Sequence, residues 1–228
     1  MITETAYGPC EFFGKDTYIG KSLYAYGEWS GDECLKILEL ANGQCLDIGA
    51  NVGFMSMAME SLGLEVIAFE PQPEIYGLLR KNIRGKCMNV ALGNVVDMVK
   101  MPRISYSRNG NYGGCSVGTR SELGTINVSC MRLDDLGLHP GFVKIDVEGY
   151  ELEVLRGGRE TILAHKPIMY IEDDRPEKSR ELRAYITELG YTIEEHQPKM
   201  FRSNNFKGRT DNIWGVDYIS KNIICRPC

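Results

Sequence analysis

The 228-residue sequence lacks the features that mark membrane and secreted proteins. One of its longest apolar stretches, residues 45–59, is interrupted by Asp47 and Asn51 and is too short to cross a bilayer. The N-terminus has no basic segment followed by an apolar one, so no signal peptide is expected. We therefore expect a cytoplasmic protein that has no membrane partner.

The sequence also has no excess of positive charge. Its formal net charge is -5 and its pI is about 5.4. A dedicated nucleic-acid-binding protein usually carries a basic stripe, so we expect no nucleic-acid partner. Histidine is scarce as well, since His139, His165 and His196 are the only three. The first two stand in predicted turns and are expected at the surface.

Closely spaced cysteines are almost absent, although the chain has eight cysteines. The one close pair, Cys225 and Cys228, ends the chain and has no second pair with which it could form a zinc site. The remaining cysteines are scattered, several of them inside apolar segments. We expect them to be reduced and to pack as small hydrophobic side chains.

What the sequence does contain is a regular alternation of strand and helix patterns. Seven segments are expected to be strands: 44–48, 65–69, 87–92, 142–147, 168–172, 191–195 and 222–225. Helices are expected over residues 54–61, 74–83, 151–163 and 177–189. This alternation predicts an α/β fold with a doubly wound, mostly parallel seven-stranded sheet and helices on both faces. The length and the 43% hydrophobic content suit a single domain over residues 1–228.

Three segments depart from the alternation. Residues 1–43 begin without periodicity and end in a helix, for which Ser30 and Glu33 predict a capping box. Residues 94–128 are rich in Gly, Ser and Asn and predict an inserted β-hairpin or lid. Residues 196–221 are expected to form a C-terminal loop.

The segment LDIGANVGF, residues 46–54, stands where the first predicted strand turns into a helix. Gly49 and Gly53 would let the backbone approach a ligand closely, beside free N–H groups at the helix N-terminus. The segment lacks the G-x-G-x-x-G pattern of dinucleotide-binding turns, which disfavours a nicotinamide dehydrogenase. Asp47 would repel a phosphate and could bind an ammonium group, so a cationic or zwitterionic ligand is favoured.

Glu70 ends the second predicted strand, 21 residues beyond Gly49. A carboxylate in this position can accept hydrogen bonds from both ribose hydroxyls of an adenosine ligand. A lone Glu at a strand end is usually solvated, but one that follows a glycine loop at this distance favours a ribose contact.

A third segment, FVKIDVEG at residues 142–149, places Lys144, Asp146 and Glu148 on one side of a strand. Ligands of open parallel sheets bind at the carboxyl ends of the strands, where Asp146 and Glu148 are expected. The two carboxylates could supply a general base or hold a divalent cation. We expect no metal site, because only two acidic ligands are evident and Lys144 would pair with Asp146.

These segments resemble the FkbM family of class I methyltransferases. The matching stretches, in family order, are LDIGANVGFMSMAM, AFEPQPEIYGLLRKNI, NVALG, VSCMRLDDL, FVKIDVEGYELEVLRGG and KPIMYIED, within residues 27–173. The most specific of them is KIDVEGYELEVLRG. The resemblance implies a Rossmann-like fold and S-adenosylmethionine as methyl donor, with S-adenosylhomocysteine as product.

The resemblance also implies roles for individual residues. The loop around the methionine part of the cofactor would contain Asp47, Gly49, Ala50, Asn51 and Gly53. Glu70 would hold the ribose, with Pro71 and Gln72 beside it. The residues packed near the adenine would be Ala91 and Leu92. Asp146 would lie near the sulfonium or the substrate, and the cofactor site would also include Glu28 and Phe54.

The family implies O-methylation of a hydroxyl on a sugar, glycan or small metabolite. The candidate bases are Asp146, Glu148, Glu172 and His196. The candidate acceptor contacts are Asn111, Tyr112, Glu172 and Asn205, because amides mixed with aromatic rings suit a carbohydrate. An N-methyltransferase acting on a small molecule, and a catalytically silent nucleoside-binding module, remain alternatives.

Overall fold

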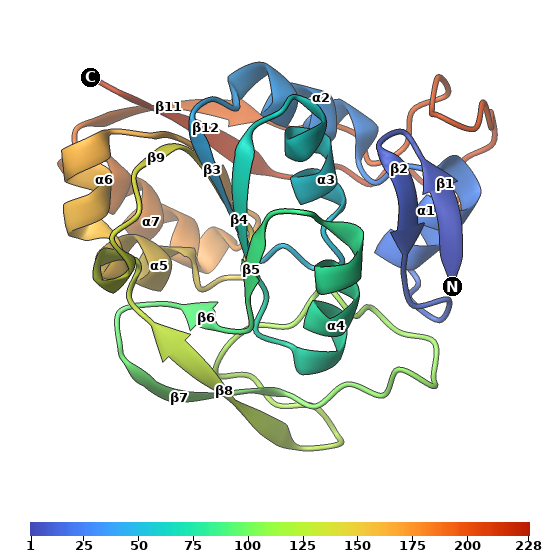
Figure 1. The fold of residues 1–228 in the computed structure, drawn as a ribbon, viewed down its shortest axis with the longest axis horizontal. Helices are drawn as coiled ribbons and strands as arrows, with labels where there is room; N and C mark the ends of the chain where they lie inside the picture. The colour runs from blue at the N-terminus through green and yellow to red at the C-terminus, as the bar shows by residue number, and fades with distance from the viewer.

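The computed structural model describes all residues from Met1 to Cys228. Its centre is a seven-stranded sheet in the order β11-β12-β10-β9-β3-β4-β5 (Figure 1). The strands are β3 (Gln44–Ile48), β4 (Glu65–Phe69), β5 (Lys86–Met88), β9 (Pro140–Ile145), β10 (Ile168–Glu172), β11 (Tyr191–His196) and β12 (Asn222–Pro227). All neighbours from β10 to β5 are parallel, whereas β12 is antiparallel to both β10 and β11. The predicted mostly parallel seven-stranded sheet is therefore confirmed.

Helices cover both faces of this sheet because its strands alternate their apolar side chains between two cores. The helices are α1 (Ile19–Tyr26), α2 (Gly31–Leu40), α3 (Phe54–Ser61), α4 (Pro73–Asn82), α5 (Glu151–Gly157), α6 (Arg159–His165) and α7 (Pro176–Glu188). On β3, Cys45 faces the core that α2, α3 and α4 complete. Leu46 and Ile48 face the core that α5, α6 and α7 complete. The doubly wound arrangement follows from this alternation.

Two predicted strands have different boundaries in the structure. The segment 87–92 is split into β5 and β6 (Ala91–Leu92), because Asn89 turns the chain by donating hydrogen bonds to the backbone oxygens of Glu70 and Pro71. The strand predicted over 142–147 ends at Ile145. Asp146 and the residues after it are therefore in a loop, where Glu148 has a φ of 59°.

The strand β6 belongs to a second, three-stranded sheet with the order β6-β8-β7. Strands β7 (Asp97–Pro102) and β8 (Thr125–Met131) pair in antiparallel fashion and are joined by the long connection 103–124. Figure 1 shows this small sheet beside β5 and α5, with the connection running below α4. The short helix η1 (Leu133–Leu136) then leads back to β9.

The chain before α2 contains structure that the sequence did not predict. Strands β1 (Ile2–Thr5) and β2 (Gly8–Glu11) form a hairpin, and α1 follows it. Ser30 precedes α2 as expected, but the predicted capping box is wrong. Ser30 has a φ of 43° and its hydroxyl donates to Glu33 Oε2 at 2.7 Å, so it makes no capping bond to the backbone.

The long loop before β12 folds back onto this N-terminal region. Arg202 forms a two-pronged ion pair with Glu28, through bonds of 2.6 and 2.8 Å. Tyr26 Oη donates to the backbone oxygen of Asp211 at 3.0 Å. In Figure 1 the loop accordingly lies beside α1. All eight cysteines are free, and none of the helices combines the length and apolarity that a membrane span requires.

Candidate active site

A cavity of about 370 Å³ lies at the carboxyl ends of the parallel strands. The order of connections reverses between β3 and β9, and ligands of doubly wound folds bind at such a switch point. We distinguish two ends of the cavity by the strands that supply them. The Glu70 end is lined by Gly49, Asn51, Glu70, Gln72, Ala91 and Leu92, and the Glu172 end by Glu148, Glu172, Arg175, Met200 and Ser220.

Glu70 is buried and is held in place by backbone groups. Its Oε2 accepts a hydrogen bond from Asn51 N–H at 3.1 Å, and its Oε1 accepts one from Gln72 N–H at 2.8 Å. Burial raises the pKa of Glu70 to about 7, although these two bonds oppose the shift. No Lys or Arg nitrogen forms an ion pair with it, so the carboxylate retains acceptor capacity toward the cavity.

Lys144 and Asp47 form a buried ion pair beside the cavity. The two residues are paired in register on β3 and β9, and Lys144 Nζ lies 3.2 Å from Asp47 Oδ1. Ser56 Oγ donates to the other Asp47 oxygen at 2.6 Å. Asp47 is fully buried and lines no part of the cavity. The expectation that its side chain contacts the cofactor is therefore corrected.

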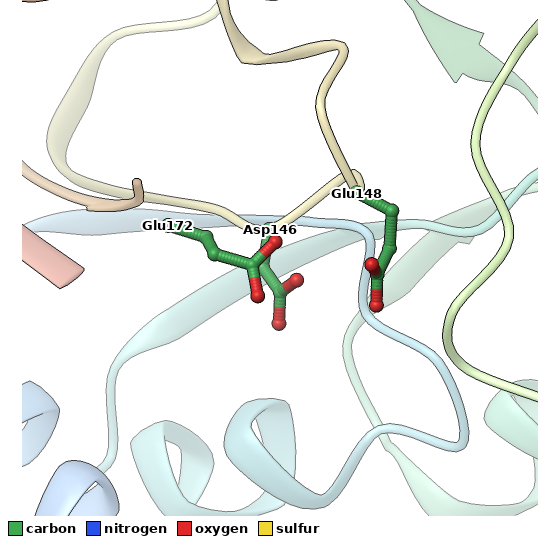
Figure 2. A group of neighbouring side chains, drawn as sticks. All are labelled: Asp146, Glu148 and Glu172. Atoms are coloured by element: carbon green, nitrogen blue, oxygen red, sulfur yellow. The ribbon is translucent and has the colours of Figure 1, made fainter. Parts of the chain in front are cut away.

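Three carboxyl groups gather beside this pair. Ligand oxygens of Asp146, Glu148 and Glu172 all lie within 4.8 Å of one another (Figure 2). Burial raises the pKa of Glu148 to about 7, and the charge of Asp146 adds to the shift. Burial, followed by the charges of Asp146 and Glu148, raises the pKa of Glu172 well above its usual range.

The three carboxyl groups differ in their partners. Asp146 Oδ2 is 3.4 Å from Lys144 Nζ, so the expected Lys144–Asp146 pair is present. Glu148 is paired with Arg175, which also binds Asp174. Glu172 has no basic partner, and its Oε2 is buried without a hydrogen bond.

This arrangement changes one argument about metal ions. The sequence shows Asp146 and Glu148 as two candidate ligands, and the structure adds Glu172 as a third. The premise that only two acidic ligands are available is therefore wrong. Lys144 and Arg175 still compete with a metal ion for two of the three carboxylates.

Comparisons with known proteins agree with this geometry. The profile of the methyltransferase FkbM domain matches residues 47–193. The chain belongs to the FkbM methyltransferase family. The methyl donor of this family is S-adenosylmethionine. No curated protein sequence matches the chain.

Solved structures show the same fold at low sequence identity. The FkbM methyltransferase from Methylobacillus flagellatus is 17% identical with a TM-score of 0.52, and the match covers 92% of this chain and 55% of that one. This chain thus spans about half the length of that protein. The precorrin-6y C5,15-methyltransferase from Geobacter metallireducens is 14% identical, with a TM-score of 0.52 and 86% of each chain covered. The magnesium protoporphyrin IX methyltransferase from Synechocystis, solved with bound S-adenosylmethionine, is 11% identical, with a TM-score of 0.50 and 87% and 78% covered.

In this member of the FkbM family, most of the expected site residues line the cavity. They are Gly49, Asn51, Glu70, Pro71, Gln72, Ala91, Leu92, Asn111, Tyr112, Asp146, Glu148 and Glu172. Ala50 and Phe54 instead line a smaller adjoining cavity of about 30 Å³. Gly53, with a φ of 90°, lines neither and packs against Leu79 and Ile83.

Three expected site residues are committed to other contacts. Glu28 is buried in its ion pair with Arg202 and also accepts a bond from Phe206 N–H. The Asn205 amide donates to the backbone oxygens of Arg202 and Arg209 and accepts from Arg209 N–H, which closes the loop on itself. Neither side chain lines the cavity.

His196 is the third expected site residue that is committed to another contact. It ends β11, outside the cavity lining, and its Nδ1 is 2.8 Å from Tyr170 Oη. Burial lowers its pKa, and Lys36 adds to the shift. The expectation that a loop would carry this histidine to the site is wrong, because β11 continues to residue 196.

The segment around residue 112 is less polar than its composition indicated. Tyr112 is 3% exposed and packs in an aromatic group with Phe13 and Tyr106, although its ring also borders the cavity. Asn111 Oδ1 accepts bonds from Gly113 N–H and Gly114 N–H, which fixes the turn over the cavity. Tyr112 is therefore a core residue as well as a wall of the site.

Several lining residues were not predicted from the sequence. They include Tyr18, Trp29, Glu33, Arg175, Met200 and Ser220. Glu33 lies on the buried face of α2 with Cys34 and Ile37, and burial raises its pKa to about 7. An acidic residue one turn before Ile37 on an apolar helix face was the available signal for Glu33. The other lining residues carried no local pattern.

Proposed function

We propose that the chain transfers the methyl group of S-adenosylmethionine to a hydroxyl group of a sugar, glycan or small metabolite. A single observation carries this proposal. One cavity contains a buried carboxylate suited to a ribose, Glu70, and a group of three carboxyl groups suited to an acceptor. The bound donor would supply an electrophilic methyl group, whose C–S bond breaks as the new C–O bond forms.

The residues at the Glu70 end fit the cofactor. Glu70 keeps free acceptor positions for the ribose hydroxyls, and Gly49 and Asn51 have positive φ angles that bring their backbone to the cavity. Ala91 and Leu92 are buried apolar residues that could flank an adenine ring. These features support the assignment of Glu70, Gln72 and the loop 49–53 to the cofactor.

The residues at the Glu172 end would orient the acceptor and remove its proton. Glu148 is our candidate base, because a pKa of about 7 suits proton transfer at neutral pH. Arg175 holds the Glu148 carboxylate in position. In the proposed step the hydroxyl proton moves to a Glu148 oxygen, while Asp146 and Glu172 bind neighbouring polar groups of the acceptor.

The covering segments favour a compact acceptor site. Asn111 from the 94–128 segment and Met200 and Ser220 from the 196–221 segment all line the cavity. We propose that these two segments together cover the acceptor, and that residues 1–228 act as one methyltransferase domain. A wall rich in carboxyl groups argues against nucleic acid as the acceptor, because phosphates would be repelled.

The test is release of S-adenosylhomocysteine from S-adenosylmethionine in the presence of candidate acceptors. A panel of sugars, glycans and small alcohols should contain at least one substrate, and each should be paired with an amine of the same skeleton. Methylation of the amines alone would favour N-methylation. Binding of the donor without any turnover would favour the catalytically silent alternative.

A matched pair of variants tests the base. Glu148→Gln should lower kcat by about 100-fold or more, since general-base catalysis is worth about 100- to 10,000-fold. Its cofactor affinity should stay near that of the unchanged protein. Glu188→Gln makes the same chemical change at an exposed site on α7 and should leave kcat unaltered.

A further inference from the structure

The net charge of -5 conceals an uneven distribution of charge along the chain. Residues 98–121, which form most of β7 and of the connection to β8, contain Lys100, Arg103, Arg108 and Arg120. The same stretch contains no Asp or Glu, although the chain as a whole has 31 of them. One segment of an acidic protein is therefore distinctly cationic.

The four cations of this segment are free to meet a partner. All four side chains are exposed. None of them forms an ion pair with a carboxylate. Arg132 and Arg209 are exposed as well, yet they pair with Asp135 and Asp211. The positive charge of the segment is thus not neutralised within the molecule.

Hydrogen bonds to the backbone hold three of these residues near one another. Gly118 N–H donates to the backbone oxygen of Lys100 at 2.8 Å, and Ser121 Oγ donates to that of Arg103 at 2.7 Å. The returning part of the connection, which carries Arg120, therefore lies against the end of β7.

A fifth cation comes from the chain before α1. Gly110 N–H donates to the backbone oxygen of Lys15 at 3.2 Å, and Thr17 N–H donates to that of Gly110 at 3.0 Å. Lys15 is exposed and has no partner among the ion pairs. Because Gly110 is two residues from Arg108, this pairing brings Lys15 close to Arg108. We define the cationic rim as Lys15, Lys100, Arg103, Arg108 and Arg120.

The cationic rim flanks the cover of the cavity. Between Arg108 and Arg120, the residues that line the cavity are Asn111, Tyr112, Gly113, Gly114, Cys115 and Val117. The surface beside the cover is thus positive, while the Glu172 end inside the cavity is lined by carboxyl groups. A ligand that matches both needs hydroxyl groups inside the cavity and anionic groups outside it.

The rim spreads its cations over the surface. Its residues come from β7, from both arms of the connection and from the chain before α1, so they suit several anionic groups on an extended chain better than a single phosphate. A nucleic acid would bring phosphates beside the carboxyl groups of the cavity, which repel them. A glycan can instead present a neutral ring there, whose hydroxyl groups donate to carboxylates.

We propose that the cationic rim binds an acceptor glycan that carries several acidic groups, while a neutral part of that glycan enters the cavity. This inference rests on the proposed function, and it selects one class among the acceptors named there. The positive rim attracts the anionic chain and raises its concentration at the cavity. The hydroxyl group that becomes methylated belongs to a sugar without an acidic group.

Binding measurements on the whole chain test the rim with a matched pair of glycans, dextran sulfate and uncharged dextran of the same length. We expect dextran sulfate to bind and dextran to show no detectable binding. The Kd of dextran sulfate should rise by about tenfold between about 50 and 200 mM salt, because ion contacts to a polyanion release counter-ions.

Charge-matched double variants assign the binding to the rim. Arg103→Gln with Arg120→Gln should weaken the binding of dextran sulfate by about tenfold, since two ion contacts are lost. The thermal unfolding midpoint should stay constant, which shows that the variant is folded. Arg159→Gln with Arg180→Gln removes the same charge from exposed positions on α6 and α7 and should leave the affinity nearly unchanged.

Three results would overturn the inference while the proposed function stands. They are equal binding of dextran sulfate and dextran, equal losses in the two double variants, and tighter binding of duplex DNA or of phosphatidylglycerol vesicles at the same concentration of anionic groups. Failure of the chain to bind S-adenosylmethionine would instead remove the proposed function, and with it the acceptor role of the rim, whatever dextran sulfate does.

Discussion

The two ends of the cavity are built from the chain in different ways. The Glu70 end comes from residues 49–92, namely from the turns directly after β3 and β4 and from the short strand β6. The Glu172 end combines segments as distant as Glu148 and Ser220. The first end depends on local turns between neighbouring strands, whereas the second depends on how remote segments pack.

Lys144 lies between the two ends, because its Nζ donates to the backbone oxygen of Gly49 at 3.2 Å and also pairs with Asp146. Its loss should have the largest effect. Lys144→Met would leave the fully buried Asp47 without its counter-charge. The free energy of unfolding should fall by about 3–5 kcal/mol, the usual cost of breaking a buried ion pair. Urea denaturation measures it. The double variant with Asp47→Asn should recover part of the loss, and no recovery would mean that Lys144 acts through other contacts.

Glu70→Ala should show whether the two ends of the cavity act independently. We expect it to weaken binding of both S-adenosylmethionine and S-adenosylhomocysteine by about 1–3 kcal/mol, because charge-assisted hydrogen bonds to the ribose are lost. Calorimetry gives the two affinities. At saturating donor the acceptor KM should stay nearly constant, and an equal rise in that KM would show that the ends are not independent.

The same residue predicts a pH dependence at the Glu70 end. Burial raises the pKa of Glu70 to about 7, so its carboxylate is ionised above pH 7 and protonated below it. The ribose needs the ionised form, and the affinity for S-adenosylhomocysteine should therefore fall by about tenfold between pH 8 and pH 6. S-Adenosylhomocysteine is chosen because its sulfur is uncharged, so that titration of Asp146, Glu148 and Glu172 should contribute little to the change in affinity. Glu70→Gln should bind weakly with little pH dependence.

A smaller change is expected at the cover of the acceptor. Asn111→Ala removes the bonds to Gly113 N–H and Gly114 N–H, which should loosen the turn over the cavity. The acceptor KM should rise, or kcat should fall, by a few fold, while cofactor affinity stays within about twofold. The neighbouring Asn109→Ala, at an exposed position, is the control. A loss confined to cofactor affinity would assign this turn to the other end.

The smallest effect is expected from chelation. We expect activity to persist in excess EDTA, since Lys144 and Arg175 already occupy two of the three carboxylates. The assay is turnover before and after dialysis against the chelator. Complete loss, reversed by Mg²⁺ or Mn²⁺, would give the Glu172 end a metal ion in place of a purely organic ligand.

The difference between the ends explains how much the sequence could predict. The sheet, and the place of Glu70 directly after β4, could be predicted because strand periodicity and the turn after each strand are local properties. The ion pair between Asp47 and Lys144 could not be predicted, because it depends on the register between β3 and β9. Glu172 was a candidate from the sequence, but its closeness to Asp146 and Glu148 depends on the packing of β10 against β9.

Boundaries failed where a single side chain redirected the backbone. Asn89 splits the predicted third strand by binding the backbone after β4, an interaction with no signature in the local pattern. His196 stayed in β11 because Asn222 continues the pairing there. The N-terminal hairpin was missed because β1 and β2 are four residues each, too short to show a period.

The position of β12 has a consequence for the order in which the sheet can assemble. Strand β12 follows both β10 and β11 in the chain, yet it lies between them. The Glu70 end is built from earlier residues and can form first, whereas β11 has no partner in the sheet until β12 inserts beside β10. A substitution that prevents β12 from pairing would thus spare the Glu70 end and detach β11 from the sheet.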